Sequence, residues 1–342
     1  MPAPAISIVI VNWNGGKVLP QCLETLTGQT FQDFEIILVD NGSTDGSTDD
    51  LETRWPQLHL KLIHLPSNAG FAAANNIGAR AAQGEWLALL NNDAFPGPNW
   101  LETLLTASRQ YPEYTFFASR LLQAGRPDII DGTGDVYHVS GAVWSRQHNY
   151  PAHLAVNQPG EVFSPQGAAA LFPRVAFLEV GGFDESYHSY HEDIDLAFRL
   201  RLRGHRCLYI PDALVYHKGS FTTGKGSDFA VLHGHRNLVW CYFQNMPGWL
   251  IWRYLPEHLL ANLFTILHIA SKGQTKAILT AKWNALCGLP RIIRKRKEIQ
   301  RSRTATLSDI LSSMDRKFLS PYILGLASRR LKRGQNTTSP TR

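Results

Sequence analysis

The chain has 342 residues, of which 44% are hydrophobic and 18% charged, the composition of a folded protein with one large domain and an appendage, or with two domains. Its formal charge of +6 is local, because the segment 291–303 holds seven cations and one anion. The rest of the chain is neutral overall, which excludes a nucleic-acid-binding surface spread over the whole protein.

The cysteines and the N-terminus bear on the compartment. Cys22, Cys207, Cys241 and Cys287 form no CxxC pair, so the spacing indicates neither a zinc site nor a disulfide framework. A reducing, cytoplasmic setting is favoured. The N-terminus enters a strand pattern without a basic segment or a long apolar run, so we expect no secretion signal.

The first 110 residues alternate between strand and helix patterns. Short apolar runs rich in β-branched residues, such as 6–11, are typical of buried strands. The expected strands are 6–11, 34–39, 60–65 and 86–90. A helix pattern or a loop leading to a helix follows each strand, with the clearest helices at 72–83 and 100–110. This alternation predicts an α/β fold with a doubly wound, mostly parallel sheet.

The rest of the chain changes character twice. Residues 113–165 contain only short strand-like pieces, and residues 249–289 are helical in pattern, aromatic and rich in leucine. We therefore expect a main domain over 1–245, a helical and basic extension over 246–333, and a disordered tail over 334–342.

Polar residues stand where apolar runs end or helices begin. They are Asp40, residues 91–93, residues 191–193 and His217. In an open α/β sheet, ligands bind outside the carboxyl ends of the strands. Carboxylates at strand ends can hold a base, a ribose and a divalent cation, and a carboxylate at a helix start can take a proton from an acceptor. Such side chains suit the transfer of a sugar from a nucleoside diphosphate.

Two of these positions suit a nucleotide. Asp40 can accept hydrogen bonds from the imide of a uracil or thymine ring or from ribose, although the Asn-Gly-Ser-Thr-Asp-Gly sequence that follows also suits a turn or cap residue. Residues 68–71 lead into a helix N-terminus, the usual place for a diphosphate. A plain strand–helix turn is the alternative, and the absence of GxGxxG gives a dinucleotide site little support.

Two further positions suit a metal ion. Asp93 can coordinate Mg²⁺ or Mn²⁺ while a diphosphate supplies other oxygens, with a turn before Pro96 as the alternative reading of this segment. A neutral imidazole at His217 is a suitable further ligand, although a single histidine at a strand end also occurs in structural roles.

The acidic run 192–195 opens a predicted helix. Three acids in a first turn are favoured by the helix dipole and can be caps only. The functional interpretation is that one of them is a general base that deprotonates an acceptor hydroxyl. Neighbouring acids would raise the pKa of such a base.

Together these segments resemble the family 2 inverting glycosyltransferases of the GT-A type, over about residues 5–245. The segments that carry the resemblance, in the family's order, are 7–14, 39–45, 68–76, 90–93, 181–185 and 191–193. The Asn-x-Gly-Phe form at 68–71 and the Asn-x-Asp form at 91–93 look most like the rhamnosyltransferase-type branch.

The resemblance implies a GT-A-type, Rossmann-like fold for nucleotide-diphospho-sugar transfer and a role for each site residue. The implied nucleotide-binding residues are Asn12, Asp40, Asn68, Gly70 and Asn91. Asp93 and His217 would bind Mg²⁺ or Mn²⁺, and Asp193 would be the catalytic base with Glu192 beside it. Asn91 departs from the family's Asp-x-Asp pattern, which predicts weaker metal binding.

The expected function is transfer of a sugar, L-rhamnose from dTDP-rhamnose, to a hydroxyl of a saccharide or a polyprenyl-diphosphate-linked saccharide in cell-surface polysaccharide synthesis. An in-line displacement would invert the anomeric centre. A catalytically inactive sugar-nucleotide-binding scaffold on the same fold is the alternative. A nucleotidyltransferase is less favoured, because the loop 12–17 carries one cation.

The C-terminal region suggests a partner surface. Residues 257–270 form an apolar helical stretch that is followed by the basic segment 291–303. This order suits attachment to an anionic membrane surface, and charged residues and a proline interrupt the region too often for a spanning helix. We expect a protein peripheral on the cytoplasmic face of the plasma (inner) membrane. A helical subdomain that packs on the core with a solvated basic face is the alternative.

Overall fold

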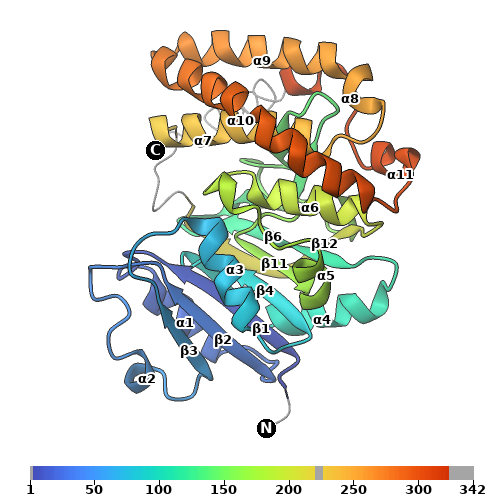
Figure 1. Cartoon of the computed structure of the whole chain (residues 1–342). Coiled ribbons are helices and arrows are strands. Elements are labelled where there is room, and N and C mark those ends of the chain that lie inside the picture. Colours follow the sequence, from blue (N-terminus) through green and yellow to red (C-terminus); the bar gives the residue numbers. More distant parts are fainter. Residues whose placement is uncertain (1–2, 220–225, 323–342) are drawn as a thin grey trace, which may run out of the picture.

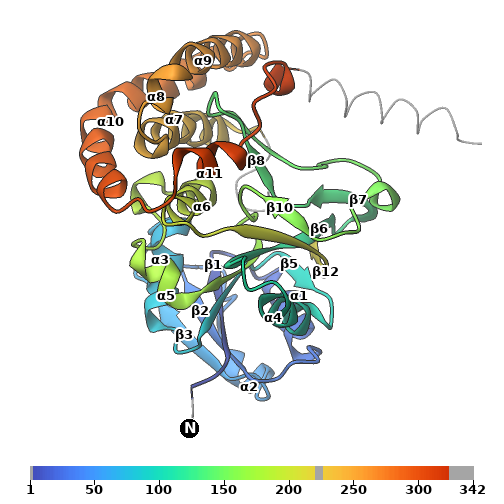
Figure 2. The ribbon, with the colours of Figure 1, turned by 90° about the vertical axis from the view of Figure 1, so that its right-hand side faces the viewer.

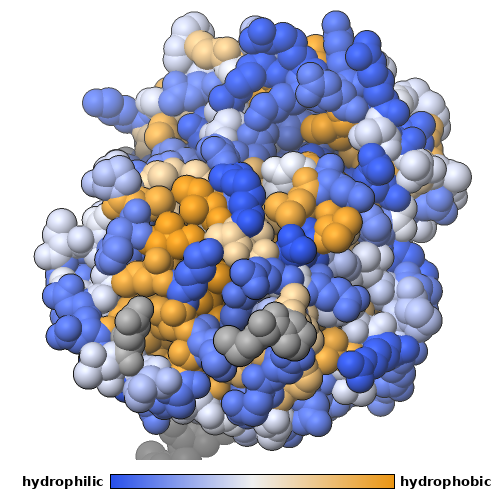
Figure 3. Space-filling view, turned by 60° about the horizontal axis from the view of Figure 1, so that its bottom comes forward, coloured by the Kyte–Doolittle hydropathy of each residue, from blue (hydrophilic) through white to orange (hydrophobic). Residues whose placement is uncertain are grey.

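A computed structural model describes residues 3–219 and 226–322, so the tail expected over 334–342 lies outside the described residues. The chain builds a twisted sheet with helices on both faces and a layer of helices at one end (Figure 1). Within the described residues, no helix is both long and apolar enough to cross a membrane. When the bottom of the molecule in Figure 1 is turned toward the viewer, hydrophilic residues cover much of the surface and apolar residues form several patches between them (Figure 3).

The sheet is mixed, and its N-terminal half is parallel. Its strand order is β10-β12-β6-β11-β4-β1-β2-β3. The parallel half consists of β1 (Ile6–Asn12), β2 (Phe34–Asp40), β3 (Leu60–His64) and β4 (Trp86–Leu90). The strand β11 (Ala169–Pro173) enters antiparallel between β4 and β6 (Phe116–Gln123), while β12 (Cys207–His217) is parallel to β6. The predicted α/β fold with a mostly parallel sheet is confirmed.

Alternation along the strands fills both faces of the sheet. Ile6, Ile8 and Ile10 belong to one buried cluster and Val9 to the other. Helices α1 (Leu19–Thr27) and α4 (Trp100–Gln110) cover the first face, and α3 (Phe71–Ala81) and α5 (Arg174–Glu179) cover the second (Figure 2). The helix expected after the second strand is only α2, with the four residues Leu51–Arg54. The remaining strands are β5 (Ala94–Pro96), β7 (Arg126–Gly132), β8 (Asp135–Tyr137), β9 (Val143–Ser145) and β10 (Gly160–Val162).

Helix α6 (Glu192–Leu202) lies between the sheet and the helical layer. Leu196, Ala197 and Leu200 pack into the second sheet cluster. Ile194, Phe198 and Leu202 pack into a third cluster with the C-terminal helices. A helix buried on all sides must also bury its polar residues, and these need partners.

The helical layer contains α7 (Asp228–Asn245), α8 (Leu250–Arg253), α9 (Leu255–Ala270), α10 (Thr275–Arg301) and α11 (Leu307–Ser312). Helices α7 and α10 lie so close that a Cβ at Gly288 would be 2.5 Å from the Trp240 ring, and Trp240 Nε1 donates to the Ala285 carbonyl at 3.0 Å. Although α7 precedes the boundary predicted at residue 245, it therefore packs as part of the helical layer.

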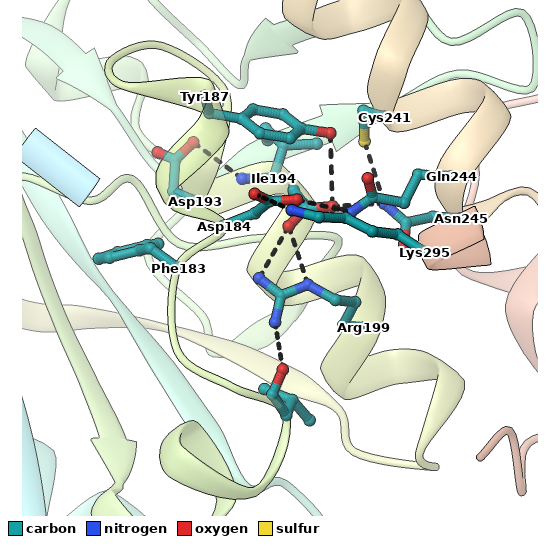
Figure 4. Close-up of polar contacts among 12 residues, drawn as sticks. Phe183, Asp184, Tyr187, Asp193, Ile194, Arg199, Cys241, Gln244, Asn245 and Lys295 are labelled. Atoms are coloured by element: carbon teal, nitrogen blue, oxygen red, sulfur yellow. Dashed lines mark hydrogen bonds and ion pairs between the residues drawn. The ribbon is translucent and has the colours of Figure 1, made fainter. Parts of the chain in front are cut away.

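Asp195 joins α6 to this layer through a buried charge network (Figure 4). Its Oδ2 accepts from Arg199 Nε at 2.8 Å, and its Oδ1 accepts from the side-chain amides of Gln244 and Asn245 at 2.8 and 2.7 Å. Nearby, Lys295 of α10 donates to Asp184 at 2.5 Å. Burial raises the pKa of Asp195, while the charge of Arg199 and the hydrogen bonds from Arg199 and Asn245 act in the opposite direction and offset part of the cost of burying the carboxylate.

We predict that Asp195→Asn lowers the free energy of unfolding by about 3 kcal/mol, because it leaves the Arg199 guanidinium buried without its counter-charge. Urea denaturation measures the change, and the control is Asp212→Asn, an exposed carboxylate on β12. An equal, small effect of both substitutions would contradict a structural role for the Asp195 network.

Candidate active site

A cavity of about 810 Å³ opens at the carboxyl ends of β1 and β4 and beneath the start of α6. Most of the predicted site residues line it. They are Asn68, Gly70, Asn91, Asp93, Glu192, Asp193 and His217. Segments far apart in the sequence thus meet in one cavity, as the strand-end pattern predicted.

Asn12 and Asp40 do not line this cavity; they lie behind its wall. Asn12 is fully buried, and its Oδ1 accepts a hydrogen bond of 2.8 Å from Asn92, which does line the cavity. The Asp40 carboxylate accepts from the Ser43 backbone at 3.0 Å and lies 3.0 Å from His64 Nδ1. A carboxylate offers about four acceptor positions, so Asp40 keeps some acceptor capacity beyond these contacts. A contact between Asp40 and a nucleobase stays a prediction.

The turn at 68–70 is built by side chains that replace backbone pairing. Asn68 Oδ1 accepts from Asn41 Nδ2 at 3.0 Å and from the Gly70 amide at 2.8 Å. Gly70 has φ +88, and a Cβ there would lie 2.3 Å from His188 Nδ1. Only glycine fits this position without displacing the cavity wall. The N-terminus of α3 follows directly, and its Ala72 amide donates to the His188 carbonyl at 3.3 Å, so an anion here would meet the positive end of the helix dipole rather than this amide.

His217 is held between two carboxylates. Its Nδ1 lies 2.8 Å from Asp131 Oδ2, and its Nε2 lies 3.3 Å from Asp93 Oδ1. Burial lowers the pKa of His217, but the hydrogen bonds and charges of Asp131 and Asp93 raise it further, to about 9. Asp131 fixes the orientation of the ring, so that Nε2 points at Asp93.

The pair of Asp93 and His217 fits a divalent cation as a two-residue site. Neighbouring ligands of an octahedral ion with bonds of about 2.1 Å lie about 3.0 Å apart, close to the 3.3 Å between Asp93 Oδ1 and His217 Nε2. Among the described residues, no group of three or more His, Cys, Asp and Glu side chains could hold a metal ion. A cation here would therefore need further oxygen ligands from a diphosphate or water.

The acids at the start of α6 separate into different roles. Asp195 turns away into the charge network, whereas Glu192 and Asp193 line the cavity. Asp193 Oδ2 accepts from the Gly167 amide at 2.9 Å, and burial raises its pKa. Burial and the charge of Asp193 raise the pKa of Glu192, whose Oε2 has no hydrogen-bond partner among the described residues. A carboxylate with a raised pKa holds a proton more strongly than an ordinary Asp or Glu, which suits a proton acceptor.

A strained segment holds these two acids in place. His188, Tyr190 and His191 have φ values of +65, +71 and +64, which are unfavourable for residues with a Cβ. The Nδ2 of Asn237 on α7 lies within 3.1 Å of the carbonyl oxygens of Tyr187, Ser189 and Tyr190. The helical layer thereby fixes the backbone conformation that places Glu192 and Asp193 at the cavity.

Sequence reasoning missed Asp131, Asp135 and Asn237. Asp131 is in β7, and its side chain reaches the end of β12. The strand-end criterion that found Asp93 applies to Asp131 as well, but the irregular pattern of 113–165 hid the strand. No signal in the chain marks Asn237, which lies within the apolar α7 helix and is fully buried.

Comparisons with known proteins bear on the family and the fold of the chain. Residues 7–181 match the sequence model of the family described as "Glycosyl transferase family 2". The chain is 28% identical to the N-acetylglucosaminyl-diphospho-decaprenol L-rhamnosyltransferase of Mycobacterium tuberculosis over 271 residues, which cover 72% of this chain and 86% of that protein. It is 29% identical to the pre-mycofactocin glycosyltransferase of the same species over 67% of this chain and 48% of that protein.

Solved structures share the fold at low sequence identity. The structure of GalNAc-T7 with UDP, GalNAc and Mn²⁺ has a TM-score of 0.57 at 18% identity and covers 71% of this chain and 48% of that chain. The structure of S. aureus TarS 1–349 has a TM-score of 0.53 at 16% identity and covers 98% of this chain and 93% of that chain. This similarity reaches over the helical layer as well as the sheet.

We predict that Asn237→Ala loosens the segment before α6, because the carbonyl oxygens of Ser189 and Tyr190 lose the Asn237 donor. Amide hydrogen exchange over residues 186–194 should rise, and the free energy of unfolding should fall by about 1–3 kcal/mol. The matched control is Asn284→Ala on α10, whose side chain is half-buried. Unchanged exchange over residues 186–194 would show that Asn237 does not hold the segment.

Proposed function

Because the chain belongs to glycosyl transferase family 2, we propose that this enzyme moves a sugar from a nucleoside-diphosphate donor to a hydroxyl of a saccharide acceptor, with inversion. The observation that carries the proposal is the placing of Asp193 and the Asp93–His217 pair on one cavity. A proton acceptor and a diphosphate site on opposite sides of a sugar are the arrangement that an in-line displacement requires.

Asp193 is the proposed general base. The backbone amides of Gly167 and Ile194 donate to its two oxygens and hold the carboxylate rigidly. Its burial favours proton uptake, so an acceptor hydroxyl beside Asp193 would lose its proton to this carboxylate as it attacks the anomeric carbon. Glu192 lies next to it as a second acceptor of hydrogen bonds.

The charge of the cavity supports a divalent cation. The described lining residues include Asp93, Asp135, Glu192 and Asp193 but no Lys or Arg. A diphosphate would meet repulsion there, and the amides at the start of α3 offer only partial charge. Asp93 and His217 would hold Mg²⁺ or Mn²⁺, which stabilises negative charge on a departing diphosphate.

The name of one relative supports a proposal for the acceptor and the pathway. The Mycobacterium tuberculosis rhamnosyltransferase is named for a lipid-linked, diphosphate-bearing N-acetylglucosamine. We therefore take dTDP-rhamnose as the first donor to test and a polyprenyl-diphosphate-linked saccharide as the first acceptor, in cell-surface polysaccharide synthesis. Such an acceptor would be reached most directly by a protein bound to the cytoplasmic face of the membrane.

The outer face of the helical layer suits such a surface. Exposed apolar residues gather on α8, α9 and α10. They are Trp249 and Trp252 at α8, Leu259, Leu260, Leu263, Phe264 and Leu267 on α9, and Leu279, Trp283 and Leu286 on α10. The opposite side of α10 packs on the core through buried residues such as Ile278 and Ile292. The layer thus packs on the core with one face and exposes apolar residues on the other. A helical subdomain that packs on the core and a surface for membrane attachment are therefore compatible interpretations of this region.

The basic segment is less available than its sequence suggests. Arg296 donates to the carbonyls of Phe243 and Met246, and Arg291 stacks over the Trp240 ring at 4.6 Å. Lys295 pairs with Asp184. The exposed cations of the segment include Arg294, Lys297 and Arg301. Apolar insertion should therefore contribute more to membrane binding than charge attraction.

We predict that the purified protein releases nucleoside diphosphate from one donor in a panel of dTDP-, UDP- and GDP-sugars, and that EDTA suppresses the release. Asp193→Asn should slow transfer to an N-acetylglucosaminyl-diphospho-polyprenol by about 10³-fold, while calorimetry shows nearly unchanged nucleotide binding. The control is Asp212→Asn, an exposed carboxylate on β12.

Near-normal transfer by Asp193→Asn would overturn the base assignment. Nucleotide binding without release or transfer by the wild-type protein would favour an inactive scaffold on the same fold.

We predict that the double variant Leu263→Ser, Trp283→Ser binds vesicles with 30% phosphatidylglycerol at least about 10-fold more weakly than the wild-type protein, because each side chain would bury apolar area in the lipid. The control is Val175→Ser on α5, which removes an equally exposed apolar residue far from the helical layer. Substitution is preferred to deletion, because α10 covers the core. Equal binding by all three proteins would overturn attachment through this face.

A further inference from the structure

One wall of the cavity carries a chain of polar side chains with no assigned role. Asp135 of β8 and Ser145 of β9 lie opposite each other in an antiparallel pair, and Gln166 precedes β11. Gln166 Nε2 donates to Ser145 Oγ at 2.7 Å, and Ser145 Oγ donates to Asp135 Oδ1 at 2.7 Å. All three residues line the same cavity as Asp193.

The direction of these hydrogen bonds leaves acceptor positions free for a ligand. The single proton of Ser145 goes to Asp135, so the Gln166 amide must donate to Ser145, and Asp135 keeps acceptor positions to spare. Asp135 is 6% exposed, and burial together with the charge of Asp193 raises its pKa. A carboxylate in such surroundings is stabilised by further hydrogen-bond donors.

Glu192 supplies an independent observation. It is 7% exposed and lines the cavity, yet its Oε2 has no hydrogen-bond partner among the described residues. A buried carboxylate oxygen without a hydrogen-bond donor costs free energy of folding, and a ligand that donates to it would remove this cost. The ligand must therefore bring several hydrogen-bond donors into a small volume and present no negative charge to these acids.

Sugar hydroxyl groups have this chemistry. The aromatic residues Trp144, Tyr190 and Phe229 also line the cavity and provide apolar surface for the C–H faces of a sugar ring. We propose that Asp135, Ser145 and Gln166, with Glu192, form a saccharide subsite that binds hydroxyl groups of a sugar beside Asp193. This inference rests on the proposed function, and the sugar is either that of the donor or that of the acceptor.

The test compares Asp135→Asn, Ser145→Ala and the double variant with the wild-type protein and with Asp212→Asn, an exposed carboxylate outside the cavity. The kinetics use the active donor from the nucleotide-sugar panel and N-acetylglucosaminyl-diphospho-polyprenol, and KM is measured for each substrate. Calorimetry with the free nucleoside diphosphate, which lacks the sugar, reports whether the rest of the site is intact.

Asp135→Asn should raise the KM of one substrate by roughly 10- to 100-fold, the range for a lost hydrogen bond to a charged group. A raised acceptor KM with unchanged donor KM and donor hydrolysis assigns the subsite to the acceptor. A raised donor KM with unchanged nucleoside-diphosphate affinity assigns it to the donor sugar. Ser145→Ala should act in the same direction and add little to Asp135→Asn, because the two residues act through one hydrogen bond.

Two results would overturn the subsite. One is an Asp135→Asn variant whose two KM values match those of the wild-type protein. The other is a variant whose affinity for the sugar substrate and for the free nucleoside diphosphate falls to the same extent, which indicates a purely structural role. A wild-type protein that turns over no donor would instead remove the proposed function itself, so the two failures are distinct.

Discussion

The buried charge of Asp195 is the constraint on which the site depends. Helix α6 has protein on every side, so the ion pair of Asp195 with Arg199 and the hydrogen bonds from Gln244 and Asn245 must take the place of water around this carboxylate. Because those amides belong to α7, the helix that opens with Glu192 and Asp193 is tied to the helical layer. The position of the cavity acids is thus a consequence of a salt bridge on the far side of the same helix.

The helical layer consequently has two faces with different tasks. Its inner face contains Asn237, which donates hydrogen bonds to the strained backbone before α6. It also contains Trp240 of α7, which packs against α10 and donates a hydrogen bond to the Ala285 carbonyl. Its outer face leaves leucine and tryptophan side chains exposed on α8, α9 and α10. Membrane attachment through this face would place the proposed lipid-linked acceptor next to the helical layer, whose inner face holds the start of α6.

The cavity gathers carboxylates that repel one another and yet are kept buried. Asp193 is held by backbone amides, Asp135 by Ser145, and Asp93 faces the imidazole ring of His217. Each acid has part of its hydrogen-bonding capacity satisfied by the protein, and the remainder is available to a ligand. A divalent cation and the hydroxyl groups of a sugar are complementary to this excess of acceptors, whereas an unaccompanied diphosphate is not.

The sequence alone determined the α/β sheet, the alternation of its strands and helices, and the strand-end positions of Asp93 and His217, because these features depend on local apolar periodicity and on where it stops. Residue type and spacing could not tell Asp193 from Asp195, since both stand in the first turn of one helix and differ only in which side of α6 each faces, and only the family resemblance pointed to Asp193. Sequence reasoning missed Asp131, Asp135 and Asn237, whose partners lie 47 to 86 residues away or on another strand. Only the tertiary structure decided those contacts, because a buried polar group acquires its role from the partners that folding brings to it.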